Sequence, residues 1–200
     1  MFKQIVVLGV LASVFTAHAG VAPYLSLSGG LNMPESDRFS YAIPSGVGTG
    51  SIDYDMGYNV AFAIGAAFDN MPLRFELETG HQKNDIDYVT PGGTASITQG
   101  NDDRSVWTYM VNTYVDINTF ENFTPFLEFG LGAADPEDVK MLYAVQMGFG
   151  VAYSITENYL LDLKYTYFIT DQYHVSVGAD AYRMERLETH QVQLGIRYQF

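Results

Sequence analysis

Strict alternation of bulky apolar residues with small or polar ones recurs along most of this chain. Within residues 58–68, one set of alternate positions carries bulky residues such as Phe62 and Ile64, and the other carries small ones such as Ala61 and Ala63. Residues 191–200 repeat the pattern with glutamines, a glycine and an arginine on the second set. A period of two residues is that of a β-strand with two chemically different faces. The chain is therefore predicted to be all-β.

Segments of this kind divide the chain into strands of similar length. They lie at 23–33, 58–68, 73–82, 105–117, 125–133, 141–154, 160–168 and 191–200, and the one at 125–133 is short. A tilted strand that crosses a membrane needs about 9–11 residues. The segments therefore predict eight antiparallel strands of membrane-spanning length.

The connections between these segments alternate between short and long. Residues 69–72, 118–124 and 155–159 are short turns, whereas 34–55, 83–104 and 169–187 are each roughly twenty residues long and 134–140 is a shorter member of this class. Outer-membrane barrels have short periplasmic turns and longer external loops. The pattern predicts an up-and-down transmembrane β-barrel of eight strands. A soluble sandwich or lipocalin-like barrel, which would turn its apolar face inward, is the alternative.

The glycine-rich stretch at 46–50 is interpreted as a flexible loop. It does not follow a strand and open a helix, as a phosphate-binding loop would.

The first residues have the features of an export signal. Lys3 precedes a short apolar run at residues 5–15, and Ala17 and Ala19 form an A-x-A cleavage site. We therefore expect residues 1–19 to be a signal peptide and residues 20–200 to form the barrel domain. An N-terminal membrane anchor is the alternative, although the apolar run is too short for a spanning helix.

Charged residues of both signs fall on the face that carries small and polar side chains. In a membrane barrel this face lines the interior, which in an eight-stranded barrel is just wide enough for side chains. The charged residues predicted to lie there are Arg74, Glu76, Glu78, Glu128, Asp162, Lys164 and Arg197. Because unpaired buried charge is costly, we expect them to pair and to plug the lumen. A gated ion path is the alternative.

Few residues suggest catalytic or metal-binding chemistry. His81, His174 and His190 are expected at or just beyond the external rim, with Ser105 nearby, but no recognisable nucleophile–base spacing accompanies them. We therefore expect no catalytic site, no cofactor and no metal site. The formal net charge of −13 opposes nucleic-acid binding. Acids of the external loops are expected to form a solvated face, or to bind divalent cations that bridge to lipopolysaccharide phosphates.

Residues 125–168 resemble the outer-membrane β-barrel family that includes opacity-type surface antigens and the OmpA-like barrel domain. The resemblance rests on Pro125-Phe126, Gly130-x-Gly132, Gln146-x-Gly148-x-Gly150, Tyr153, Thr156-Glu157-Asn158 and Asp162-x-x-Tyr165, and the terminal Tyr198-Gln199-Phe200 resembles the aromatic assembly signal of such barrels. It implies a bacterial outer-membrane location among lipids and lipopolysaccharide, and insertion by the barrel-assembly machinery. Glu128 and Thr166 depart from the family pattern, which commonly has glycine and a basic residue there.

These features favour a non-enzymatic barrel that serves as a scaffold for four external loops. The loops would act in adhesion, in recognition of a host or other surface ligand, or in envelope integrity. A small pore or passive channel for small solutes is the alternative. A rim-located enzyme that modifies lipid or peptide is the third hypothesis.

Overall fold

A computed structural model describes residues 20–43, 46–91, 103–117, 120–137, 140–177 and 180–200 of the chain. The predicted signal peptide, with Ala17 and Ala19, lies outside the described residues. No helix in the described part is long and apolar enough to cross a membrane.

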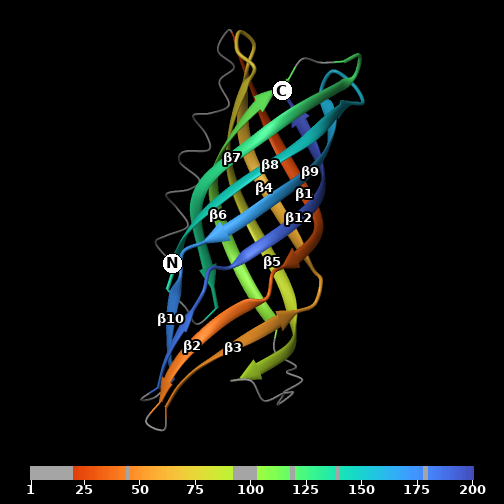
Figure 1. Ribbon diagram of the computed structural model, residues 1–200. Coiled ribbons are helices and arrows are strands. Elements are labelled where there is room, and N and C mark those ends of the chain that lie inside the picture. Colours follow the sequence, from red (N-terminus) through yellow and green to blue (C-terminus); the bar gives the residue numbers. More distant parts are fainter. Residues whose placement is uncertain (1–19, 44–45, 92–102, 118–119, 138–139, 178–179) are drawn as a thin grey trace, which may run out of the picture.

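Eight strands close into an antiparallel barrel (Figure 1). They are β1 (Val21–Pro34), β4 (Gly57–Phe68), β5 (Leu73–Pro91), β6 (Asp103–Asp116), β7 (Phe123–Pro136), β8 (Leu142–Ser154), β9 (Tyr159–Thr170) and β12 (Glu188–Gln199). Each pairs with the next along the chain, and β12 closes the barrel on β1. The predicted eight-stranded up-and-down barrel is confirmed. Strand β7 is longer than the segment predicted at 125–133.

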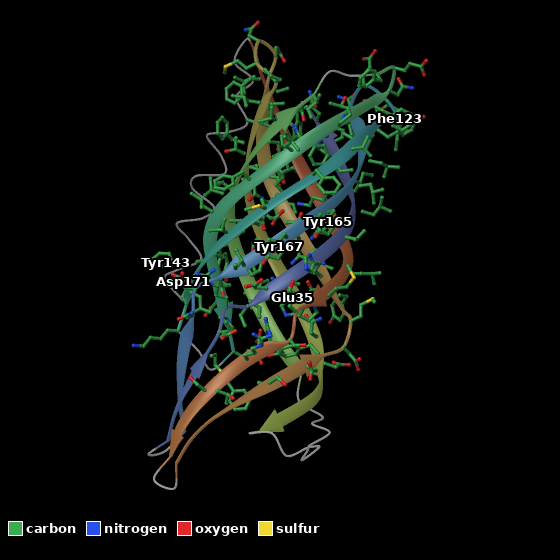
Figure 2. The ribbon with its side chains drawn as sticks, viewed as in Figure 1. Glu35, Phe123, Tyr143, Tyr165, Tyr167 and Asp171 are labelled. Atoms are coloured by element: carbon green, nitrogen blue, oxygen red, sulfur yellow. The ribbon has the colours of Figure 1, made fainter. Side chains whose placement is uncertain are left out.

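The faces of the strands are reversed relative to a soluble protein. On β5, Arg74 and Glu76 are buried in the lumen, while Phe75 and Leu77 are 44% and 50% exposed on the outer wall. The same alternation runs around the barrel, where large apolar side chains point away from the wall (Figure 2). An apolar outer surface of this extent suits lipid rather than water. The soluble alternatives are therefore excluded.

Four shorter strands continue the wall at one end of the barrel, here called the hairpin end. They are β2 (Asp37–Ile43), β3 (Gly46–Tyr54), β10 (Tyr173–Val177) and β11 (Asp180–Met184). Together with the far part of β5 they form a sheet in the order β10-β11-β2-β3-β5, which extends away from the C-terminus (Figure 1). The opposite end, here called the turn end, carries short turns and the C-terminus.

The long connections predicted at 34–55, 83–104 and 169–187 are more regular than the word loop implies in the residues that the structure describes. Most of them are strands, because pairing between neighbouring hairpins satisfies their backbone groups. The glycine-rich stretch at 46–50 forms part of β3 and is not a flexible loop.

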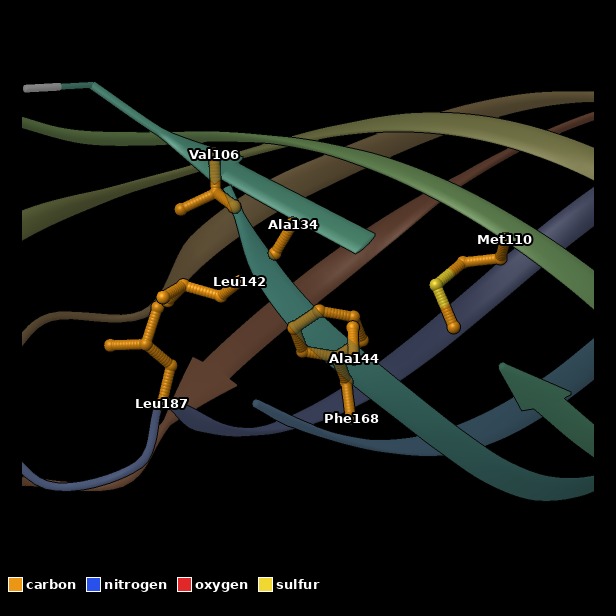
Figure 3. Packing of buried hydrophobic residues seen from close by; sticks show 7 residues of the cluster. All are labelled: Val106, Met110, Ala134, Leu142, Ala144, Phe168 and Leu187. Carbon is orange, nitrogen blue, oxygen red and sulfur yellow. The ribbon is translucent and has the colours of Figure 1, made fainter. Parts of the chain in front are cut away.

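Apolar and aromatic side chains fill the lumen at two levels. Near the hairpin end, one wall carries a buried cluster of Val106, Met110, Ala134, Leu142, Ala144, Phe168 and Leu187 (Figure 3). Toward the turn end, Tyr24, Tyr114 and Phe126 are almost completely buried. A Cβ atom on Gly65 would lie 2.2 Å from the Tyr24 ring, so this glycine leaves the space that the tyrosine occupies.

Candidate functional site

The turn-end half of the lumen is built around Arg74. Its Nε and Nη2 atoms donate to Asp116 on β6 at 2.9 Å, and its guanidinium lies 4.5 Å from the Tyr114 ring centre and 5.0 Å from that of Phe126. A planar guanidinium suits both a bidentate carboxylate contact and stacking on aromatic faces. Asp116 was missing from the predicted charged set. The alternation of residues 105–117 places it on the inward positions, so the sequence held the signal for it.

Lys164 lies at the centre of the lumen among carboxylates. Its Nζ atom is 3.2 Å from Glu128 Oε1 and 3.4 Å from Glu78 Oε2. The Tyr114 hydroxyl lies 2.9 Å from Glu128 Oε1 and 3.0 Å from Glu76 Oε1. One cation and one hydroxyl therefore tie together three carboxylates that would otherwise repel one another.

The two departures from the family pattern contact each other. The Thr166 hydroxyl donates to Glu128 Oε2 at 2.9 Å, and Gln146 Nε2 donates to Glu128 Oε1 at 3.2 Å. A hydroxyl thus partners Glu128 where the resemblance led us to expect a basic residue. Farther toward the turn end, Arg197 pairs with Asp162 at 2.9 Å.

Amide side chains occupy the wall opposite the apolar cluster. Asn32 Nδ2 and Gln191 Nε2 donate to Gln82 Oε1 at 3.2 and 3.3 Å. Gln193 Nε2 donates to Asn59 Oδ1 at 2.6 Å. These contacts join β1, β5, β4 and β12 across the hairpin-end half of the lumen.

The lumen leaves almost no free volume between these groups. The cavity among Arg74, Glu76, Tyr114 and Lys164 has about 20 Å³, and the one among the amides has about 10 Å³. A single water molecule needs roughly 10–15 Å³. Each of these two cavities among the described side chains therefore has room for about one water molecule.

The hairpin end, in contrast, holds an open pocket of about 920 Å³. Its walls come from β2, β3 and the segments that flank β10 and β11, and it is lined by Pro34, Glu35, Ser36, Asp37, Arg38, Ser51, Asp53, Gln172, Glu185, Arg186 and Glu188. Five of these side chains are acids and two are arginines. The lining of the pocket is mostly polar.

A clasp of three residues fixes the β2–β3 hairpin to the barrel. Arg104 Nη1 on β6 pairs with Asp37 Oδ2 at 3.0 Å, the Tyr54 hydroxyl donates to the same oxygen at 2.8 Å, and the guanidinium lies 4.6 Å from the Tyr54 ring centre. Burial raises the pKa of Asp37 above its usual value, although Arg104 acts in the opposite direction. Burial likewise raises the pKa of Tyr54. The hairpin is thereby held as a fixed continuation of the wall.

Comparison with known proteins identifies the family of this barrel. The family model described as "Outer membrane protein beta-barrel domain" matches residues 5–200. The chain belongs to this family. Among curated proteins it is 26% identical to the outer membrane protein PagN of Salmonella typhimurium over 159 residues, which cover 65% of this chain and 66% of PagN. It is 28% identical to an uncharacterized protein of Brucella abortus (strain 2308) over 142 residues, which cover 51% of this chain and 50% of that protein.

Solved structures support the same fold. The crystal structure of the outer membrane protein OprG from Pseudomonas aeruginosa matches with a TM-score of 0.62 at 12% identity, over 90% of this chain and 97% of OprG. The chain spans about half the length of the Brucella relative. The family and its members place this outer-membrane β-barrel in the bacterial outer membrane.

The two histidines whose side chains the structure describes lie apart on the outer wall of this outer-membrane barrel. His190 on β12 contacts the Tyr165 hydroxyl at 2.6 Å and Glu35 at 3.0 Å. His81 on β5 lies 2.9 Å from Ser105 Oγ. Strands β4 and β1 separate β5 from β12, so these histidines do not share a site. The side chain of His174 is outside the described part.

Within the described part of the chain, no group of three or more histidine, aspartate or glutamate side chains could hold a metal ion.

The C-terminal aromatics of this outer-membrane barrel lie together at the turn end. The Tyr198 ring centre is 5.0 Å from that of Tyr159 and 4.9 Å from that of Phe200. Their role as an assembly signal stays a prediction.

Proposed function

We propose that this protein is a closed outer-membrane scaffold whose hairpin end recognises a ligand outside the cell. The observation that supports this most directly is the contrast in free volume. Cavities in the lumen measure about 20 and 10 Å³, whereas the pocket at the hairpin end measures about 920 Å³. A molecule of appreciable size has room in the hairpin-end pocket and not in either of these two lumen cavities.

The rigidity of the hairpin end supports the same proposal. The clasp of Arg104, Asp37 and Tyr54 fixes β2 and β3, and β11 pairs with β2. A fixed surface loses less conformational entropy on binding than a flexible loop does. The proposal includes adhesion and surface recognition, with contacts to lipopolysaccharide as part of the same role. A contribution to envelope integrity is the second candidate, and the paired charges that join strands across the lumen favour it.

The experiment compares variants of the hairpin end in bacteria that lack the native protein. In one variant a short turn replaces residues 37–54, and in another Asp53→Asn and Glu185→Gln neutralise two acids of the pocket. The matched control carries Asp135→Asn and Glu137→Gln, two acids near the same end that do not line the pocket. Attachment to cultured epithelial monolayers and survival in detergent are measured.

We expect both pocket variants to lower attachment about tenfold or more, which corresponds to about 1.4 kcal/mol of binding free energy. The control should attach like the wild type, and detergent survival should not change. Undiminished attachment by the trimmed variant would overturn the recognition role. Loss of detergent survival without loss of attachment would favour envelope integrity instead.

A further inference from the structure

Ser105 and His81 form a polar contact on the outer wall of the barrel that neither the plugged lumen nor the external pocket explains. Ser105 Oγ on β6 lies 2.9 Å from His81 Nε2 on β5. Both side chains point outward and are partly exposed. When His81 is neutral and carries its proton on Nδ1, the serine hydroxyl donates to Nε2. This is the arrangement of a nucleophile with its general base.

The surroundings of this pair change from apolar to charged along the strands. Directly across from His81 lie Trp107 on β6 and Val60 on β4, both 48% exposed. Directly across from Ser105 lies Lys83, which pairs with Asp103. Exposed tryptophans mark the interface between membrane and water in such barrels. The exposed Trp107 therefore supports a position of the pair at this interface.

We propose that Ser105 and His81 form a nucleophilic dyad that cleaves acyl esters of membrane amphiphiles. Ser105 supplies the nucleophile and His81 the base. The substrate class is a long-chain ester in the outer leaflet, whose acyl chain would lie along Val60 and Trp107. The ammonium group of Lys83, directly opposite Ser105, provides positive charge for an anionic head group or for the developing oxyanion.

The reaction needs no oxidant and no cofactor. Ser105 Oγ bonds to the ester carbonyl carbon, the carbonyl electron pair moves onto the oxygen, and the hydroxyl proton passes to His81 Nε2. Collapse of this intermediate breaks the ester C–O bond, and the alcohol leaves with the proton from Nε2. Water then cleaves the acyl-serine with the same base, which releases the fatty acid and restores both residues.

Turnover by this dyad should be slow. Within the described residues, no carboxylate accepts a hydrogen bond from His81 Nδ1. Loss of the orienting carboxylate in a serine-protease triad lowers kcat by about 10⁴. Covalent capture of Ser105 is therefore a better readout than turnover, because one reaction per molecule is enough.

The test uses the full barrel refolded in detergent micelles and a long-chain alkyl fluorophosphonate, with adducts located by mass spectrometry. We expect a single adduct on Ser105, none at that position in Ser105→Ala, and labelling slowed about 100-fold or more in His81→Ala. Ser154→Ala, a serine near the turn end, is the matched control and should label like the wild type. The rate of fatty-acid release from p-nitrophenyl palmitate micelles should likewise be lost in Ser105→Ala, be lowered in His81→Ala and stay at the wild-type value in Ser154→Ala.

Folding of each variant is checked by the resistance of the barrel to SDS before heating. A folded wild type that takes up no probe would overturn the proposal. Labelling at another serine that persists in Ser105→Ala would also overturn it. Because this readout does not involve the hairpin pocket, its failure leaves the recognition role unaffected.

Discussion

Removing the positive charge of Lys164 tests the charge pairing that fills the lumen. The side chain is about 9% exposed and contacts Glu128 and Glu78 at 3.2 and 3.4 Å. At an effective dielectric constant of about 20, each contact is an attraction of about 5 kcal/mol, which the cost of desolvating the charges largely offsets. Removing one partner leaves the other carboxylates buried without their cation. We therefore expect Lys164→Met to lower the free energy of unfolding by about 3–5 kcal/mol.

The chain contains one tryptophan, Trp107, which lies on the outer wall and reports on unfolding. Urea unfolding in lipid vesicles, followed by its fluorescence, measures the effect. Lys140→Met, at an exposed lysine, is the matched control and should change stability by less than about 0.5 kcal/mol. Adding Glu128→Gln to Lys164→Met should restore part of the loss, because it removes one of the unpaired charges. A Lys164→Met barrel as stable as the control would refute the reasoning.

Two further predictions concern packing and pH. Gly65→Ala places a methyl group against the Tyr24 ring and should lower the free energy of unfolding by about 1–3 kcal/mol. In the double variant Gly65→Ala/Tyr24→Ala, the two losses should be less than additive, because the ring that meets the methyl group is gone. Strictly additive losses in urea unfolding would contradict this contact. Burial raises the pKa of Asp37 when the β2–β3 hairpin is held against the barrel by the clasp. With the hairpin detached, Asp37 would be exposed and would lose its proton near its usual pKa of 3.8, so the attached hairpin keeps this proton to higher pH. Attachment of the hairpin should therefore weaken as the pH rises from about 3.8 through the raised pKa of Asp37. Amide hydrogen exchange in β2 and β3 measures this, and Asp37→Asn should remove the dependence.

The barrel itself could be predicted, because each residue of a strand faces either the lipid or the lumen and its type reflects that environment. Each strand must present one apolar and one polar face, and successive residues point to opposite faces. The alternation in the sequence therefore assigns Arg74 to the inward face and Phe75 to the outward face. The same spacing placed Glu128 and Lys164 on the inward face. It could not supply their partners, because these depend on the stagger between strands. The contact of Lys164 with Glu78 joins residues 86 positions apart.

The same rule could not predict the hairpin end, and it placed Ser105 near His81 at the external rim without predicting their contact. Strands β2 and β3 extend past the closed barrel, where neither face of a strand has to be apolar. Their sequence therefore lacks the alternation, and glycines such as Gly48 and Gly50 make β3 resemble a loop. Ser105 and His81 belong to different strands and meet on a diagonal of the ladder. Only the register between β5 and β6 brings them together.

Single-channel recording in planar lipid bilayers tests most directly whether the lumen is closed. The wild-type barrel should insert without conductance steps, because the cavities among the paired charges and among the amides each have room for about one water molecule. The variant that lacks residues 37–54 should also stay closed, since the side chains that fill the barrel come from the wall and not from the hairpin. Stable open-channel steps in the wild type would contradict the account, and steps that appear only in the trimmed variant would show that the hairpin, rather than the lumen, closes the barrel.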